Sequence, residues 1–178
     1  MARVMKWTTV VFFILTAVWT GLYFLCGKWA LPFAITFGTC FYHFAMRLLV
    51  GYCLHSTMKN RANYHKAWYQ LRPFERRLYQ MLKVRKWKNH MATFDPTLFD
   101  PALHSWEEIA QAMCQAELVH EIIIVLSFIP LFAAIPFGAF PVFLVTSLLS
   151  AAYDLSFVIM QRYNRPRVVK LINKKARV

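Results

Sequence analysis

The chain has 178 residues, of which 58% are hydrophobic and 16% are charged, and its formal net charge is +13 at pH 7. This composition is too apolar for an ordinary soluble domain and indicates an integral membrane protein. The basic residues do not form one stripe on a soluble fold, so we expect no nucleic acid partner.

Four apolar segments follow along the chain, and each is long enough to cross a hydrocarbon core of roughly 30 Å as a helix. They occupy residues 7–26, 29–54, 118–135 and 142–160. No small-residue cleavage pattern follows the first segment, so we predict an uncleaved anchor. The sequence therefore predicts an all-α integral membrane protein with four transmembrane helices, folded as a single membrane domain over residues 1–178.

Basic residues are distributed unevenly around these segments. Ten Lys and Arg lie in the loop 55–117 and seven in the tail 161–178. The connection between the first two segments holds only Lys28, and the connection 136–141 holds no charge. By the positive-inside rule, the loop, the tail and both termini are predicted to be cytoplasmic in a multi-pass protein of the cell membrane. Such basic clusters also attract anionic membrane lipids or a phosphorylated substrate.

The loop 55–117 has a mixed pattern. Residues 64–82 are basic and aromatic, and their apolar side chains recur at near-helical spacing, which predicts an amphipathic helix in the membrane interface. The Phe-Asp-Pro sequences at 94–96 and 99–101 are turn signals. Ser105, followed by two glutamates, predicts the N-cap of a helix that continues through Glu117 into the third membrane segment.

Glu117, His120 and Glu121 have the spacing of one helix face at the cytosolic mouth of the third segment. A carboxylate beside an imidazole fixes its tautomer and stabilises its cation, as a general base for a hydroxyl requires. His120 and Glu117 are therefore our candidate catalytic residues. An interfacial ion pair and a covalent route through Cys114 are the alternatives. Glu-x-x-His is half of a di-iron pattern, but no second copy follows, so no metal is expected.

Two basic motifs accompany this pair. Pro166 is predicted to end the fourth helix within Gln161–Arg167, which would turn three guanidiniums toward the interface, where arginine binds phosphate or carboxylate bidentately. The motif Val84–Lys88 places a tryptophan among bases, as interface anchors do. The candidate substrate-binding residues are Arg162, Asn164, Arg165, Arg167, Arg85, Trp87 and Lys88. A stop-transfer cluster and an interface anchor are the simpler interpretations. His90 and Asp95 match a His-x4-Asp acyltransferase motif in two residues only.

Two ionisable residues fall inside the membrane segments. Arg47 and Asp154 each lie about seven residues from the predicted cytosolic ends, hence roughly 10 Å deep. An unpaired charge at that depth is costly, so the two are a candidate pair across a polar cavity, to which the nearby His43 would contribute. Snorkelling of Arg47 to the interface is the alternative. The four cysteines show no disulfide or zinc spacing.

The motifs Val84–Lys88, Ala116–His120 and Gln161–Arg167 occur together in this order. Taken jointly, they resemble the glycosyl-4,4'-diaponeurosporenoate acyltransferase family, whose members are similar to the enzyme that completes the carotenoid staphyloxanthin. The resemblance extends from about Phe74 to the end of the chain, while the first two segments match only as hydrophobic spans. Asp154 stands where the resemblance leads us to expect asparagine.

This resemblance implies carotenoid or lipid biosynthesis by a membrane-embedded O-acyltransferase, which moves a fatty acyl group onto a sugar hydroxyl of an amphiphilic lipid acceptor. His120, oriented by Glu117, would deprotonate the hydroxyl, and Arg162 with Arg165 would hold the donor or the oxyanion. No cofactor is expected, because acyl-CoA, an acyl carrier protein thioester or an acyl lipid serves as donor substrate. The competing interpretations are a non-enzymatic membrane scaffold or lipid-binding protein, and another lipid-modifying enzyme acting near a phosphate headgroup.

Overall fold

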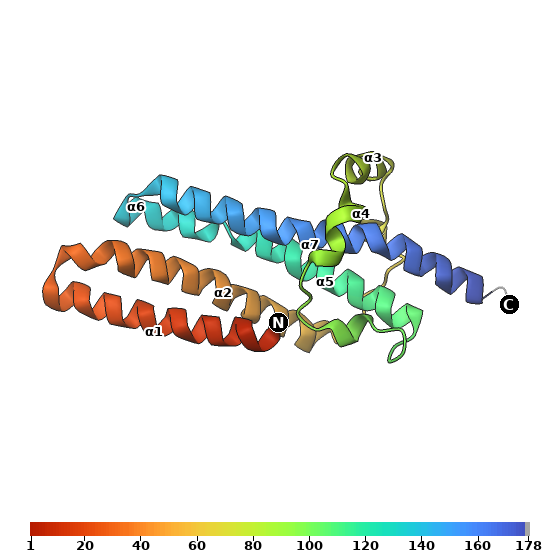
Figure 1. Ribbon diagram of the computed structural model, residues 1–178, viewed down its shortest axis with the longest axis horizontal. Helices are drawn as coiled ribbons and strands as arrows, with labels where there is room; N and C mark the ends of the chain where they lie inside the picture. Colours follow the sequence, from red (N-terminus) through yellow and green to blue (C-terminus); the bar gives the residue numbers. More distant parts are fainter. Residues whose placement is uncertain (177–178) are drawn as a thin grey trace.

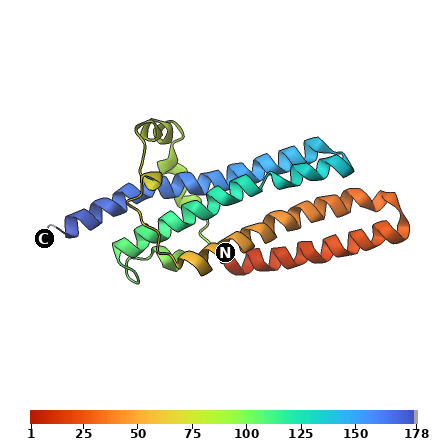
Figure 2. The same cartoon turned by 180° about the vertical axis from the view of Figure 1, so that it is seen from behind.

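The computed structural model describes residues 1–176 and contains no β-strand in that range. Four helical segments are long and apolar enough to cross a membrane, namely Ala2–Cys26, Lys28–Met58, Trp106–Phe137 and Phe140–Lys175. They run along the long axis of the molecule as two hairpins (Figures 1 and 2). The predicted all-α membrane fold with four spanning helices is confirmed, and the chain is a multi-pass membrane protein.

The two hairpins turn at the same end of the bundle, which we call the turn end. The first consists of α1 (Ala2–Cys26), the short 3-10 helix η1 (Lys28–Ala30) and α2 (Leu31–Met58). The second consists of α5 (Trp106–Leu126), η5 (Ile129–Ala133), α6 (Ala134–Phe137) and α7 (Phe140–Lys175). Gly27 and Gly138 form the turns with φ of 100° and 68°, values that a residue without a Cβ adopts readily. The opposite end, which holds Met58 and Trp106, is the loop end.

Aromatic side chains hold the first hairpin together. The rings of Trp19 and Phe33 stack with centroids 4.3 Å apart, and those of Phe12 and Phe44 stack at 5.6 Å. No residue of α1 is buried. Many of its apolar side chains therefore face outward, which is stable in lipid and would be an aggregation hazard in water.

The third membrane segment is interrupted rather than continuous over 118–135. Pro130 has no N–H group, so it cannot bond the carbonyl of Leu126 one turn earlier, and α5 ends there. Tyr42 of α2 donates its hydroxyl to that Leu126 carbonyl at 2.8 Å. The break is thus stabilised by a neighbouring helix, as a backbone group freed within a membrane requires.

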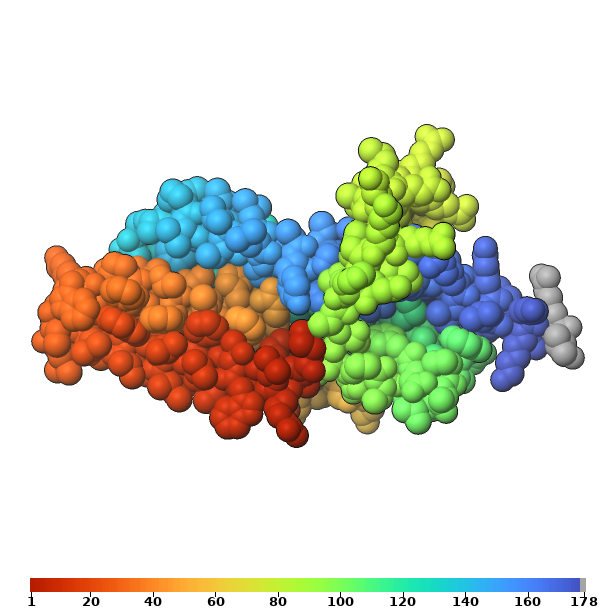
Figure 3. Space-filling view, viewed as in Figure 1, coloured from red at the N-terminus to blue at the C-terminus, as the bar shows by residue number. Residues whose placement is uncertain are grey.

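The loop between the hairpins contains five short helices. They are η2 (Ala67–Tyr69), α3 (Pro73–Met81), α4 (Val84–Trp87), η3 (Lys88–His90) and η4 (Pro96–Phe99). The prediction of one helix over 64–82 was wrong in its first half, because Arg72 is extended (ψ 152°), as the residue before a proline prefers. Helix α3 stands away from the bundle (Figures 1 and 3). Its outer stripe is exposed and apolar, as in an interfacial helix, and consists of Phe74, Leu78, Met81 and Leu82.

Sequence signals predicted the start of α5 correctly and the end of α7 incorrectly. Ser105 is the N-cap of α5, where its hydroxyl accepts from the N–H of Glu108, so the predicted start is confirmed. The predicted end of the last helix at Pro166 was wrong, since α7 continues to Lys175. Pro166 has no N–H group, so one backbone hydrogen bond of the helix is missing there. The side chains of Arg162 and Arg165 form ion pairs that hold the helix in place at this point.

Candidate active site

His120 lies in the second half of α5, counted from the loop end, and is partly open at 22% side-chain exposure. Its ring stacks on Phe157 of α7 with centroids 4.6 Å apart and an interplanar angle of 8°. Its Nδ1 atom is 2.8 Å from Oδ1 of Asp154. Its Nε2 atom has no hydrogen-bond partner among residues 1–176. The imidazole is therefore fixed by two contacts and presents one free nitrogen.

Asp154 is almost completely buried on α7, at 1% side-chain exposure. Arg47 of α2 donates from Nη2 to its Oδ2 atom at 2.5 Å and to the hydroxyl of Ser150 at 2.8 Å. The candidate pair of Arg47 and Asp154 thus exists, and Arg47 does not snorkel to the interface. Its guanidinium compensates the charge of a carboxylate that would otherwise be buried alone.

The contact with Asp154 favours one tautomer of a neutral His120. A carboxylate can only accept, so with Asp154 ionised it is Nδ1 of His120 that donates. The lone pair then lies on Nε2, which is the arrangement of a general base oriented by a carboxylate. The sequence singled out Asp154 because it is a charged residue within an apolar segment. Its contact with His120 could not be predicted in this way, because that contact depends on how α5 and α7 face one another.

The predicted pairing of Glu117 with His120 is wrong. Successive residues of a helix are rotated by about 100°, so side chains three apart diverge by about 60° and can meet different neighbours. Glu117 is fully buried, and its Oε1 atom accepts from Arg162 Nη1 at 2.6 Å. Its Oε2 atom accepts from Arg165. Glu121, the third member of the predicted face, accepts from the indole N–H of Trp68 at 2.9 Å.

The structure also contradicts a free arginine cluster around Pro166 of α7. Arg162 and Arg165 are only 9% and 3% exposed. Arg162 donates to Glu75 at 2.7 Å and to the backbone carbonyls of Trp68 and Gln70 at 3.0 and 3.1 Å. Arg165 donates to the carbonyl of Tyr69. These guanidiniums are occupied by protein carboxylates and carbonyls, so they position the loop instead of presenting free donors to a substrate.

The remaining polar residues of this motif join α7 to the loop. Lys88 donates from Nζ to Oδ1 of Asn164 at 2.7 Å, and Arg167 lies over the ring of Tyr163 at 4.3 Å. Partial burial, with the Arg167 guanidinium nearby, lowers the pKa of Lys88. Among the three motif arginines, only Arg167 is exposed.

Other candidate residues lie apart from His120. Arg85 is exposed, and Trp87 donates its indole N–H to the carbonyl of Leu82 at 3.0 Å. Cys114 is fully buried, with its sulfur 3.5 Å from a nitrogen of Arg165. Asp95 bonds Thr97 and caps η4, so it does not orient His90. Residues 1–176 contain no group of His, Cys, Asp and Glu arranged to hold a metal ion.

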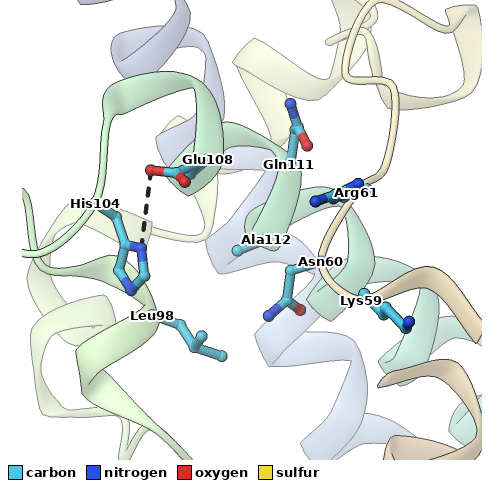
Figure 4. Close-up of a pocket in the computed structure, with 8 residues that line it drawn as sticks. All are labelled: Lys59, Asn60, Arg61, Leu98, His104, Glu108, Gln111 and Ala112. Atoms are coloured by element: carbon cyan, nitrogen blue, oxygen red, sulfur yellow. Dashed lines mark ion pairs between the residues drawn. The ribbon is translucent and has the colours of Figure 1, made fainter. Parts of the chain in front are cut away.

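Two pockets lie near the loop end. The larger, of about 440 Å³, lies between the end of α2 and the start of α5 (Figure 4). Its lining residues are Lys59, Asn60, Arg61, Leu98, His104, Glu108, Gln111 and Ala112. His104 lies 3.9 Å from Glu108, while Lys59 and Arg61 form no ion pair within residues 1–176. The smaller pocket, of about 220 Å³, includes Glu121, the residue after His120.

Comparisons with known proteins support one family. No curated protein and no solved structure matches the chain. The family model for glycosyl-4,4'-diaponeurosporenoate acyltransferase matches residues 65–174, which include the loop, α5 and α7 and therefore both His120 and Asp154. The match covers more than half of the chain, so this protein belongs to the glycosyl-4,4'-diaponeurosporenoate acyltransferase family and is an acyltransferase.

Proposed function

We propose that the protein transfers a fatty acyl group onto a sugar hydroxyl of a membrane glycolipid at His120, between α5 and α7. The observation that carries this proposal is the pairing of His120 with the buried Asp154, which leaves Nε2 free. Asp154, compensated by Arg47, is the positioning residue, and His120 is the catalytic residue. This assignment replaces Glu117, whose two oxygens are bound by arginines.

The reaction needs one proton acceptor and no resident cofactor. Nε2 of His120 takes the proton of the acceptor hydroxyl while the hydroxyl oxygen attacks the acyl carbonyl. The bond from the carbonyl carbon to the donor sulfur or oxygen then breaks, and the leaving group takes the proton from Nε2. Atoms and charges balance for acyl-CoA, for an acyl carrier protein thioester and for an acyl lipid. Lys59 and Arg61, which form no ion pair within residues 1–176, line the pocket of Figure 4 and suit a donor that carries phosphate.

The purified protein in lipid nanodiscs should form an ester when a long-chain alkyl glucoside is supplied together with one of these donors. Mass spectrometry should find the glucoside increased by the acyl group, and free thiol should appear in equal amount when the donor is a thioester. Failure of all three donor classes with alkyl glucosides and native membrane glycolipid extract alike would contradict the proposal. The same three-way comparison identifies the donor.

We also propose that both termini, the loop 55–117 and the tail 161–178 lie in the cytoplasm, in the cell membrane, where the basic residues of the loop contact anionic lipid. In a cysteine-free background, Phe137→Cys at the turn end should react with a membrane-impermeant maleimide added to intact cells. Lys174→Cys in the tail should react only after lysis. The opposite labelling pattern would mean that the orientation is inverted. Phe137 is preferable to Gly138, whose positive φ disfavours a side chain.

A further inference from the structure

Two of the predicted substrate-binding residues, Lys88 and Arg167, meet beside the ring of Tyr163 on α7. The Nζ atom of Lys88 is 5.5 Å from the ring centroid, and the guanidinium carbon of Arg167 is 4.3 Å from it. The two cations are therefore no more than about 10 Å apart, the sum of these distances. Helix α4, which precedes Lys88, packs on α7 (Figure 1). We call Lys88 and Arg167 the cation pair.

Both members of the cation pair are held in place. Lys88 donates from Nζ to Oδ1 of Asn164 at 2.7 Å, and Arg167 donates from Nη2 to the hydroxyl of Tyr163 at 2.8 Å. The Tyr163 ring in turn contacts the buried Tyr79 of α3, with centroids 6.2 Å apart. An ammonium has three N–H donors and a guanidinium has five, so most of these donors are still free to bind an anion.

No carboxylate neutralises the cation pair. Neither cation forms an ion pair within residues 1–176. Glu75 and Glu117, the carboxylates that do bind arginines of α7, are occupied by Arg162 and Arg165. Burial lowers the pKa of Lys88, and the neighbouring guanidinium lowers it further. Two like charges held this close repel one another, and a bound anion relieves that repulsion.

The cation pair lies outside the candidate active site. Tyr163 follows Asp154 by nine residues, which corresponds to two and a half turns of α7 and about 14 Å along its axis. Tyr163 therefore points to the opposite side of α7 from Asp154, the residue that holds His120. An anion bound by the cation pair is on the wrong face of α7 to take part in chemistry at His120. The cation pair is thus a second site.

The depth of the cation pair matches that of lipid phosphates. Tyr163 is three residues beyond Met160, where the predicted fourth membrane segment ends, and hence about 5 Å beyond it along α7. The headgroup layer on each side of a hydrocarbon core is about 5–7 Å thick. Leu149 and Ala152, farther toward the turn end, point within about 40° of the direction of Tyr163 and are exposed. An acyl chain can pack there while the phosphate of the same lipid reaches the cation pair.

We propose that the cation pair binds the phosphate of one anionic phospholipid, whose acyl chains lie along the exposed face of α7. Arg167 supplies a planar group that bonds two phosphate oxygens, and Lys88 supplies a point charge. A zwitterionic headgroup brings a cation of its own to the pair, so an anionic headgroup binds better. Because Lys88 belongs to the loop and Arg167 to α7, the phosphate also fastens the loop to the bundle. The inference does not depend on acyl transfer.

Native mass spectrometry of the full chain in neutral detergent tests the site, with phosphatidylglycerol as the anionic probe and phosphatidylcholine as the zwitterionic one. The wild-type protein should retain one phosphatidylglycerol at concentrations at which phosphatidylcholine does not bind. Lys88→Gln combined with Arg167→Gln should weaken phosphatidylglycerol binding at least about tenfold, because both charged donors are lost. Lys88→Arg, which keeps the charge, should retain most of the affinity. His120→Ala should bind the lipid as the wild type does.

Thermal unfolding separates lost binding from a folding defect. Without added lipid, the variant that lacks both cations should unfold near the wild-type temperature, because neither residue forms an ion pair within residues 1–176. Phosphatidylglycerol should raise the unfolding midpoint of the wild type, since a ligand that binds only the folded state stabilises it. It should leave the midpoint of the variant unchanged. An equal rise in both proteins would overturn the inference.

A matched control separates this site from diffuse surface charge. Arg77→Gln combined with Lys86→Gln removes the same charge from two exposed loop residues and should change phosphatidylglycerol binding less than about twofold. Equal losses in the two double variants would overturn the inference, because binding would then follow total charge. Coenzyme A serves as a soluble source of phosphate. If it displaces phosphatidylglycerol from the wild type and fails to bind the variant without the cation pair, the site belongs to a soluble ligand and the inference is also overturned.

Discussion

His120→Ala should lower the rate of acyl transfer about 10²- to 10⁴-fold, the usual contribution of a general base. The folded structure should persist, because the ring is partly exposed and stacks only on Phe157, and Asp154 keeps its ion pair with Arg47. The measurement is kcat per mole of folded protein in nanodiscs, alongside the thermal unfolding midpoint of each variant in detergent.

The control for this variant is His55→Ala. His55 is an exposed histidine near the end of α2 and lies outside the site. It should transfer acyl groups at the wild-type rate. A His120→Ala protein within about threefold of wild type would remove His120 from the chemistry. An equal loss in both variants would point to a general effect of removing a histidine.

Glu117→Gln should destabilise the protein by about 3–5 kcal/mol, because removing one partner of a buried ion pair leaves an uncompensated charge. Arg165 would lose its only carboxylate partner within residues 1–176, whereas Arg162 would keep Glu75. For a chain of this size the loss corresponds to a lowering of the unfolding midpoint by roughly 6–20 °C. Thermal unfolding in detergent, followed by near-ultraviolet circular dichroism, measures it.

The matched control for that change lies ten residues earlier on α5. Glu107→Gln removes the same charge from an exposed position in the first turn and should shift stability by no more than about 0.5 kcal/mol. If Glu117→Gln and Glu107→Gln unfold at the same temperature, Glu117 does not stabilise the protein through Arg162 and Arg165 as expected. A large loss of activity with full stability in Glu117→Gln would restore it as a candidate for the chemistry.

The sequence was sufficient for features that depend on local chemistry or on the lipid as solvent. Four apolar segments predicted the four spanning helices, because a helix is one of the few ways to satisfy the backbone in hydrocarbon. Ser105 predicted the start of α5, since a hydroxyl there can bond the N–H of Glu108. The depth of Arg47 and Asp154 predicted their contact, since an isolated charge at that depth is costly.

The arrangement of the site could not be read from spacing. Glu117 and His120 lie close together along α5 but point in different directions around it. Glu117 faces the arginines of α7, whereas His120 faces Asp154. Which side chain meets which depends on the rotation of α5 against α7, and this is a property of the packed pair. The extension of α7 past Pro166 has the same origin, because ion pairs distant in sequence outweigh a local helix-breaking preference.

The pairing of Arg47 with Asp154 imposes an order on biosynthesis. The two residues are 107 positions apart in the chain, so at roughly 5–20 residues per second the ribosome makes the arginine about 5–20 s before its partner. During that interval Arg47 lies in the first hairpin without its carboxylate partner. The insertion machinery or a nearby lipid phosphate must then compensate its charge. Helix α7 then brings Asp154 to Arg47 and takes over that compensation, so the catalytic centre can mature only after α7 has been made.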